Sequence, residues 1–341
     1  MLPIVLVLGG GPDGEREVSI KSAAGIAAGL ESSGRYTPNL QIIDRLNPSQ
    51  LRAMNGDILL PYLHGPYGEG GPLQDVLEQD GRPYFGTGPR GSRLAMDKLA
   101  SKAAALEHGI PTAAVAILNS NDDVSPLPLP VIIKPVHEGS TLGLRVCVTK
   151  AEYAAAVAAI RVEQQKGSRR AYMVEAKIGG LTQALELTVG LLDGKPLPVI
   201  AIKPKDGLYD YEAKYNRNDT QYLIDPEEVS DTIKKKISKS TARIAKALGL
   251  RHLCRADFML DQHGVASFLE INTTPGFTDH SLVPKAARFA GLTLPDLCAQ
   301  FADMALRDAK LPPAVEPASH NKDESKGKRA DHLELNSADL G

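Results

Sequence analysis

A predicted β-hairpin over residues 254–272 constrains this chain more than any other feature of its sequence. Two runs of strand-forming residues, 254–260 and 265–271, flank Asp261-Gln262-His263-Gly264, a composition typical of a turn. A four-residue loop predicts three facing pairs: Leu260 with Val265, Asp257 with Phe268, and Arg255 with Glu270.

The two faces of this hairpin differ in chemistry, because side chains alternate along a strand. One face suits a core and carries Ala256, Phe258, Leu260, Val265, Leu269 and Ile271. The other carries Arg255, Asp257, Glu270 and Asn272, expected within about 5–8 Å of each other. Two carboxylates and a carboxamide are oxygen ligands that suit Mg²⁺ together with substrate phosphates. A solvated face with cross-strand ion pairs is the alternative, and the unusual loop that follows, 273–281, favours the metal site.

Composition excludes several classes of function. A chain of 341 residues can form two or three domains, and a net charge of −2 argues against nucleic acid or an anionic membrane as partner. The three cysteines, Cys147, Cys254 and Cys298, are too widely spaced to indicate zinc or a disulfide framework. The apolar N-terminus lacks a basic leader, so it predicts a first strand, and no apolar run approaches the roughly 18 residues of a membrane span.

Alternating strand and helix patterns predict a parallel α/β layer first, followed by helices on mixed sheets. The expected strands are 3–8, 39–43, 57–63, 83–85, 130–134, 143–148, 173–175, 186–192 and 197–203. The expected helices are 17–30, 73–79, 94–108, 152–162, 233–248 and 297–306. The fold class is therefore α+β, assembled from α/β modules. The polar stretch after Pro312 predicts a disordered tail over 312–341.

A glycine-rich loop at residues 9–14 follows the first predicted strand. It matches the G-x-G-x-x-G pattern of dinucleotide-binding proteins. However, Pro12 lacks an N–H donor, and Asp13, Glu15 and Glu17 would repel a pyrophosphate at the start of the helix. Glu15 would instead suit a cationic group such as a substrate ammonium, or it could simply stabilise the helix.

A second loop, residues 134–143, begins with Lys134 at the end of a strand. Its Gly, Ser and Thr residues can present backbone N–H groups to phosphate oxygens, and Lys98 could add a second positive charge. A tight hairpin with an exposed lysine is the alternative. The aperiodic stretch 204–226, which includes Tyr209–Asn216, is typical of a lid, and the glycine-dense segment 64–71 could line the same cleft.

In this order, the motifs resemble those of the D-alanine–D-alanine ligases of the ATP-grasp superfamily. The likeness extends from about residue 3 to residue 306 and rests on GGGPDGEREVS, LHGPYGEGGPLQ, AMDKLASK, IIKPVHEGSTLG, YDYEAKY, RADFML and EINTTPGFTDHSLVPKAA. The resemblance implies a three-domain ATP-grasp architecture, with an N-terminal substrate-binding domain (1–92), a central domain (93–176), a C-terminal catalytic domain (177–311) and the tail (312–341). ATP would lie between the central and C-terminal domains.

The resemblance also implies a role for each candidate site residue. Glu15 would hold the ammonium of the first D-alanine, and Ser140 and Tyr215 would hydrogen-bond with Glu15. Arg255 and the Gly276 backbone would form an oxyanion site, and Ser281 would contact the carboxylate of the second D-alanine. The cofactor-binding residues would be Lys98 and Lys134 on the phosphates, Glu175 and Glu186 near adenine and ribose, and Lys214 over the transferred phosphoryl group. Asp257, Glu270 and Asn272 would bind two Mg²⁺ ions, for which Mn²⁺ could substitute.

The implied reaction makes D-alanyl-D-alanine for peptidoglycan precursors through an acyl phosphate, releasing ADP and phosphate. A homodimer in the cytoplasm is expected, and Tyr215 after Lys214 favours an amine as the second nucleophile. Three departures from the family pattern stand out: Glu175 and Glu186 are further apart than usual, Ala176 replaces a common lysine, and Thr141 replaces a common serine.

Three other functions stay open at this stage. An ATP-grasp ligase could use D-serine, D-lactate or another amino acid as its second substrate. A nucleotide-binding module without ligase activity would lack Mg²⁺-dependent ATP turnover. A dinucleotide-dependent oxidoreductase built on Gly9–Gly14 would bind NAD(H) tightly.

Overall fold

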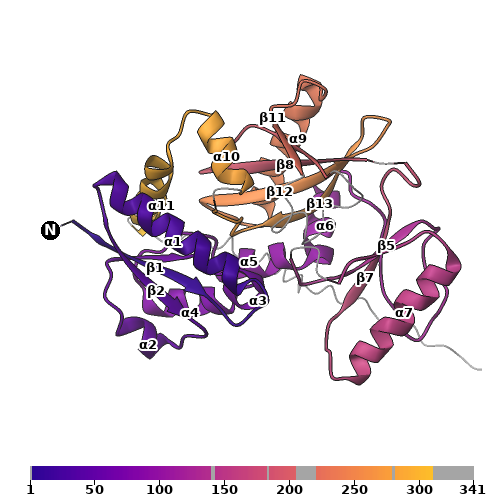
Figure 1. The fold of residues 1–341 in the computed structure, drawn as a ribbon, viewed down its shortest axis with the longest axis horizontal. Helices are drawn as coiled ribbons and strands as arrows, with labels where there is room; N and C mark the ends of the chain where they lie inside the picture. Colours follow the sequence, from indigo (N-terminus) through magenta and orange to yellow (C-terminus); the bar gives the residue numbers. More distant parts are fainter. Residues whose placement is uncertain (1, 140–142, 183, 205–219, 279–280, 310–341) are drawn as a thin grey trace, which may run out of the picture. The chain divides into compact units, whose positions relative to one another are not determined.

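A computed structural model describes residues 2–139, 143–182, 184–204, 220–278 and 281–309, and the predicted tail therefore lies outside the described residues. Three sheets lie along the described chain, each built mainly from one segment of the sequence (Figure 1). The strands are β1 (Ile4–Gly10), β2 (Thr37–Ile43), β3 (Ile58–Pro61), β4 (Val115–Ile117), β5 (Val131–Pro135), β6 (Arg145–Cys147), β7 (Tyr172–Ala176), β8 (Leu185–Leu192), β9 (Lys195–Pro196), β10 (Ile200–Lys203), β11 (Gln221–Ile224), β12 (Leu253–Leu260) and β13 (Ala266–Asn272). The helices are α1 (Arg16–Ser33), α2 (Pro48–Arg52), α3 (Gly65–Gly68), α4 (Pro72–Asp80), α5 (Pro89–Met96), α6 (Lys98–Glu107), α7 (Lys150–Gln165), α9 (Asp231–Ala247), α10 (Leu282–Phe289) and α11 (Leu294–Ala309).

The first sheet is parallel, with strand order β2-β1-β3, as the N-terminal pattern predicts. Strand β1 is buried on both faces: Val5 and Val7 pack in one core cluster with residues of α1 and α11, and Leu6 and Leu8 pack in another with residues of α2 and α4. Helices α1 and α11 lie side by side although they come from opposite ends of the described chain (Figure 1).

The second sheet is antiparallel, with strand order β4-β7-β5-β6, and α7 covers one face. Alternation along β5 decides which side chains reach that helix. Val131 and Ile133 pack in the core cluster with residues of α7, so Ile132 and Lys134 point to the opposite face. In β7 the same rule places Glu175 on the face of Lys134.

The third sheet has the order β11-β10-β8-β12-β13, with β9 paired to β8. One face packs with α9, and its core includes Leu187, Ala256 and Phe258. Leu192, Ile200 and Leu253 instead join the core cluster that contains α1 and α11. The N-terminal layer and the third sheet therefore share one hydrophobic core.

The predicted hairpin forms, but its predicted register is wrong. Leu260 pairs with Ala266, Asp257 with Glu270, and Arg255 with Asn272. The turn is one residue longer than expected, and a register shift next to Asp257 leaves Leu269 without a facing partner. An extra residue of this kind is a β-bulge, which redirects side chains.

The bulge exchanges two side chains between the faces. Phe268, predicted opposite Asp257, is fully buried and contacts Phe258 edge-to-face with ring centroids 5.8 Å apart. Leu269, predicted to be core, lines the main cleft. Val265, also predicted to be core, is 39% exposed because it belongs to the turn. The shared face of Arg255, Asp257, Glu270 and Asn272 is confirmed by their pairing.

The helix predicted over 94–108 is two helices. Helix α5 ends at Met96, and Asp97 caps α6 by accepting hydrogen bonds from the N–H groups of Leu99 and Ala100, at 2.9 and 3.0 Å. Lys98 is thereby the first residue of α6.

No helix among the described residues has both the length and the apolarity to cross a membrane. The predicted domain boundaries, after residues 92, 176 and 311, stay predictions.

Candidate active site

A cleft of about 720 Å³ is lined by residues of the second and third sheets and by Lys98 of α6. One part of its wall is charged and includes Lys98, Lys134, Glu175, Asp257 and Glu270. Another part is apolar and is formed by Ile132, Leu144, Val146, Ile178, Leu181, Ala184, Leu185, Ile202, Met259 and Leu269. An amphipathic cleft of this kind suits a ligand with a phosphate chain and an apolar ring.

Glu175 lies at the base of the charged part, 1% exposed, between two lysines. One carboxylate oxygen is 2.5 Å from the Lys102 ammonium, and the other pairs with the Lys134 ammonium. The two ammonium groups hold the pKa of Glu175 below its ordinary value although burial acts in the opposite direction. Burial lowers the pKa of Lys102 to about 8, and the Glu175 carboxylate opposes that shift.

Lys134 keeps its positive charge. Burial alone would lower its pKa, but the carboxylates of Glu175, Glu270 and Glu186 together outweigh it and raise the pKa. A fixed ammonium at the base of the cleft suits an anionic ligand such as a phosphate.

Lys98 connects the loop after β5 to the third sheet. Its ammonium donates to the backbone carbonyl of Glu138 at 2.5 Å and lies 3.1 Å from the Glu270 carboxylate. The Asn272 side-chain oxygen accepts a hydrogen bond from the N–H of Thr274 at 2.8 Å, which orients the carboxamide at the end of β13.

Asp257 is buried and held from two sides. The Arg255 guanidinium donates to its two oxygens at 3.0 and 2.8 Å, and the Thr188 hydroxyl on β8 donates to it at 2.6 Å. In this arrangement Arg255 balances the charge of Asp257.

The candidate metal ligands fit Mg²⁺ only as part of a shared site. Within the described ranges, no three His, Cys, Asp or Glu side chains gather into a complete cage. Asp257, Glu270 and Asn272 present hard oxygen donors on one face beside two lysines, so the remaining ligands would have to be phosphate oxygens and water.

A second group of polar residues surrounds Glu15, which is 8% exposed. A methyl group added at Gly139 would lie 3.1 Å from a Glu15 oxygen, so the second loop passes directly over this carboxylate. Burial, followed by the charge of Glu15, raises the pKa of Glu69 to about 8. Burial lowers the pKa of His64, and Glu15 opposes that shift. Both residues also face Arg255 and the backbone of Thr274.

The loop after β13 is fixed against the N-terminal layer. The Tyr62 hydroxyl donates to the carbonyl of Pro275 at 2.7 Å, and Ser22 accepts from the N–H of Phe277 at 3.1 Å. The Ser281 hydroxyl accepts from the N–H of Thr278 at 2.9 Å, and a methyl group added at Gly276 would lie 3.0 Å from it. A side chain at position 276 would therefore crowd Ser281.

The structure places most predicted site residues in two connected groups. Lys98, Lys134, Glu175, Glu186, Asp257 and Glu270 line the cleft, and Glu15, Arg255, Asn272, Gly276 and Ser281 belong to the region toward the N-terminal layer. Ser140, Lys214 and Tyr215 lie outside the described residues. Their predicted roles stay predictions.

Sequence reasoning missed Lys102, His64 and Glu69. Lys102 follows Lys98 by one helical turn, which was the available signal for a second lysine on the same face. His64 and Glu69 lie in the glycine-dense segment 64–71, but nothing in that segment indicated that both would be buried beside Glu15.

Comparison with known proteins gives a consistent result. Residues 111–303 match the family model described as the D-ala D-ala ligase C-terminus. The chain is 39% identical over 308 residues to a D-alanine–D-alanine ligase of Acinetobacter baumannii, covering 89% of this chain and 96% of that protein. A crystal structure of D-alanine–D-alanine ligase from Bacillus anthracis complexed with ATP has a TM-score of 0.74 and 28% identity, covering 91% of this chain and 99% of the other. The VanG D-Ala:D-Ser ligase from Enterococcus faecalis shares the fold, with a TM-score of 0.73, 24% identity and coverage of 89% and 100%.

Proposed function

Because this chain belongs to the D-alanine–D-alanine ligase family of ATP-grasp enzymes, we propose that it joins two D-alanine molecules in an ATP-dependent reaction that supplies peptidoglycan precursors. The observation that carries the proposal is the meeting of two sites at β12. Asp257 on this strand faces the charged cleft, and Arg255, two residues earlier, faces the group around Glu15.

The first step transfers a phosphoryl group. The carboxylate of the first D-alanine attacks the γ-phosphorus of ATP, the bond to the bridging oxygen breaks, and ADP leaves with that electron pair. Lys98 and Lys134 neutralise phosphate charge, and Glu175 holds Lys134 in place from below. Glu15 attracts the ammonium of the same D-alanine and so orients its carboxylate toward the phosphate. Positioning and charge neutralisation supply most of the catalysis in reactions of this type.

The second step forms the peptide bond. The free amine of the second D-alanine attacks the carbonyl carbon of the acyl phosphate, and a tetrahedral oxyanion develops. Arg255 and the Gly276 N–H are the proposed donors to this oxyanion. Phosphate then leaves with its bonding pair and takes up the proton that the attacking nitrogen loses. Glu69, whose raised pKa favours the protonated carboxyl, and His64, whose lowered pKa favours the neutral imidazole, are both buried and would exclude water around the reacting carbonyl.

Mg²⁺ would be held by Asp257, Glu270 and Asn272, and when bound it supplies positive charge that stabilises the phosphate oxygens. Two ions are proposed, with Mn²⁺ as a substitute.

Glu186 would contact the ribose. Ser140 and Tyr215 would bond to Glu15, Lys214 would approach the transferred group, and Ser281 would contact the second D-alanine. A cytoplasmic homodimer is the proposed state of the enzyme.

The test is phosphate release from Mg-ATP by the purified protein, with the product identified by mass. D-alanine is offered alone or together with D-serine, D-lactate or L-alanine. D-alanine-dependent release with a D-alanyl-D-alanine product supports the proposal. Release only with another partner would identify that compound as the second substrate. No release with any partner would contradict ligase activity.

A matched pair of variants tests the metal face. Glu270→Gln should raise the Mg²⁺ concentration needed for half-maximal turnover at least tenfold, because one carboxylate ligand is lost. Glu107→Gln, an exposed carboxylate on α6, is the control and should leave that concentration unchanged. Equal behaviour of the two variants would contradict the assignment of Glu270.

A further inference from the structure

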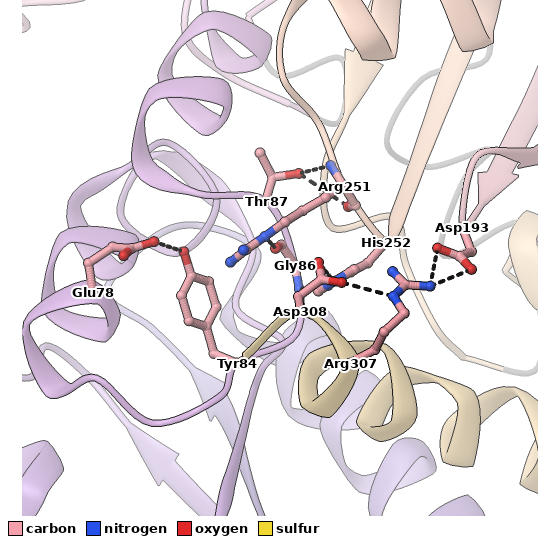
Figure 2. A network of polar contacts seen from close by, with 9 residues as sticks. All are labelled: Glu78, Tyr84, Gly86, Thr87, Asp193, Arg251, His252, Arg307 and Asp308. Atoms are coloured by element: carbon pink, nitrogen blue, oxygen red, sulfur yellow. Dashed lines mark hydrogen bonds and ion pairs between the residues drawn. The ribbon is translucent and has the colours of Figure 1, made fainter. Parts of the chain in front are cut away.

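A buried polar junction surrounds His252, three residues before Arg255 (Figure 2). The His252 side chain is inaccessible to solvent, and its backbone has a φ of 65°, in the left-handed region. That conformation is strained for a non-glycine residue. Such strain persists where several contacts of the residue require it.

Both ring nitrogens of His252 are used. The N–H of Gly86 donates to Nδ1 at 2.9 Å, and Nε2 lies 2.8 Å from an oxygen of Asp308 on α11. Because Nδ1 accepts a hydrogen bond, the imidazole proton resides on Nε2 and is donated to Asp308. The ring is therefore neutral and held in one orientation.

The neighbouring residues extend the junction to Gly86 and Thr87, which follow the N-terminal sheet. Arg251 donates from Nε to the Gly86 carbonyl at 2.6 Å, and its backbone N–H donates to the Thr87 hydroxyl at 3.3 Å. The Arg251 guanidinium also lies 4.5 Å from the ring centre of Tyr84, which forms a bridge to β3 at Leu59. The dipeptide 251–252 thus binds residues 84–87, the segment that follows the N-terminal sheet.

The other side of the junction is equally fixed. The His252 carbonyl accepts from the N–H of Asp193, in the turn between β8 and β9, at 2.6 Å. Arg307, which directly precedes Asp308 in the sequence, donates to the two oxygens of Asp193 at 2.8 and 2.7 Å (Figure 2). The imidazole stacks on Phe85, with ring centroids 5.4 Å apart.

These contacts lie between the two halves of the proposed D-alanine site. Strand β12 starts at Leu253 and carries Arg255, whereas Tyr62 and His64 follow β3 in the N-terminal layer. A shift of the N-terminal sheet relative to β12 would change the separation between the Glu15 carboxylate and the Arg255 guanidinium.

We propose that His252 is a positioning residue for the D-alanine site: through Gly86 and Asp308 it sets the spacing between the N-terminal layer, which carries Glu15 and His64, and the strand that carries Arg255. The inference rests on the proposed function for its substrate. It does not extend to the nucleotide, whose cleft is lined by residues further along β12 and by the second sheet.

His252→Gly is the decisive variant, because glycine accepts the left-handed backbone without strain and removes both imidazole hydrogen bonds. We expect KM for D-alanine to rise about 10- to 100-fold, since small misplacements of binding groups have effects of that size. The dissociation constant for ADP should stay within twofold. An unchanged KM for D-alanine, or an equal loss of ADP affinity, would overturn the proposal.

Two further variants separate positioning from general loosening. Asp308→Ala should raise KM for D-alanine, whereas Asp308→Asn, which keeps an oxygen acceptor for Nε2–H, should restore it to within about threefold. The matched control is Asp303→Ala on the same helix, because Asp303 also binds the N-terminal layer, through Tyr36 at 2.6 Å and Arg35 at 2.7 Å, but does not touch His252. If Asp303→Ala raises KM as much as His252→Gly, the junction has no special role.

A readout without substrate keeps this inference separate from the proposed function. In His252→Gly, backbone hydrogen exchange should accelerate in residues 62–69 and 84–87 and stay unchanged in β5 and β7. If the wild-type protein makes no dipeptide but this exchange pattern appears, the positioning role stands and the proposed function fails. If His252→Gly of an active ligase shows unchanged hydrogen exchange and an unchanged KM for D-alanine, the positioning role is wrong and the proposed function stands.

Discussion

Single buried charges decide much of the chemistry of the cleft, and Glu175 is the clearest case. Its carboxylate is 1% exposed and is shared by the ammonium groups of Lys102 and Lys134. Attraction between buried charges offsets the cost of removing each from water only while all partners are present. Glu175 therefore favours the charged form of both lysines, of which Lys134 lines the cleft.

We predict that Glu175→Gln lowers the free energy of unfolding by about 3–5 kcal/mol, because it leaves two ammonium groups without a buried counter-charge. Urea denaturation measures this. The control is Asp123→Asn, which removes an ion pair with Arg161 in which Asp123 is 60% exposed, and it should cost under about 1 kcal/mol. Similar losses in the two variants would show that burial does not determine the effect.

A second residue-scale prediction concerns Glu69. Burial and the neighbouring charge of Glu15 raise its pKa from 4.5 to about 8, so the native state binds a proton that the unfolded chain releases. The resulting stability is present below pH 4.5 and is lost as the pH rises through about 8. Between pH 7 and pH 9 the wild-type protein should lose about 1 kcal/mol more than Glu69→Gln. If the unfolding free energies of the wild-type protein and Glu69→Gln change equally between pH 7 and pH 9, the prediction is wrong.

At the scale of secondary-structure elements, the bulge in β13 is the feature that shapes the candidate metal-binding face. Without it, the pairing of Phe258 with Phe268 would continue and Asp257 would face Leu269. Glu270 would then point toward the core together with Phe268. One unpaired residue thus allows two phenylalanines to pack on one face and three candidate metal ligands to gather on the other.

The turn between β7 and β8 leads to a prediction about nucleotide affinity. Lys177 donates to the Gly180 carbonyl at 2.8 Å, and Leu181 lines the apolar part of the cleft while 79% exposed. A bound base should cover this side chain. Leu181→Ala should weaken ATP binding about fivefold, from the loss of about 1 kcal/mol of apolar burial.

Calorimetric titration with ATP in the absence of D-alanine measures the effect of Leu181→Ala. Leu106→Ala on α6, where Leu106 is 60% exposed and does not line the cleft, is the control and should leave ATP affinity unchanged. If Leu181→Ala binds ATP as tightly as the wild type, the base does not reach this turn.

At the scale of the whole described molecule, the N-terminal layer and the third sheet are joined by a common apolar core and by the polar junction at His252. Tyr62, Phe277 and Phe301 pack together in that core with edge-to-face ring contacts. The apolar core resists separation of the N-terminal layer and the third sheet, whereas directional hydrogen bonds at the junction fix their relative position.

The junction should make stability depend on acidity. Burial lowers the pKa of His252 from 6.5 to about 4; Arg251 and Arg307 act in the same direction and Asp308 opposes them. The neutral ring therefore stabilises the protein above pH 6.5, and this contribution is lost as the pH falls toward 4. From pH 7.5 to pH 5, the wild-type protein should lose about 2 kcal/mol more unfolding free energy than His252→Gly. Urea denaturation at the two pH values measures it, and identical pH dependence would contradict a buried neutral histidine.

The sequence by itself determined most of the elements and the polar face of the hairpin. Alternation in β12 and β13 was enough to place Arg255, Asp257, Glu270 and Asn272 on one face, because strand periodicity is a local property. The motifs, taken in order, were sufficient to identify the family. The break between α5 and α6 could not be predicted from the sequence, since Asp97 interrupts a continuous helical pattern without any glycine or proline.

Only the tertiary structure decided which charges meet. Lys102 reaches Glu175 across 73 positions of the sequence, and His252 reaches Gly86 across 166. Contacts of this kind depend on how sheets pack, and packing is a property of the assembled core, not of any local pattern. The bulge at Leu269 has the same origin: Phe268, and not Leu269, packs against Phe258 in the core, a contact that the periodicity of a single strand does not reveal.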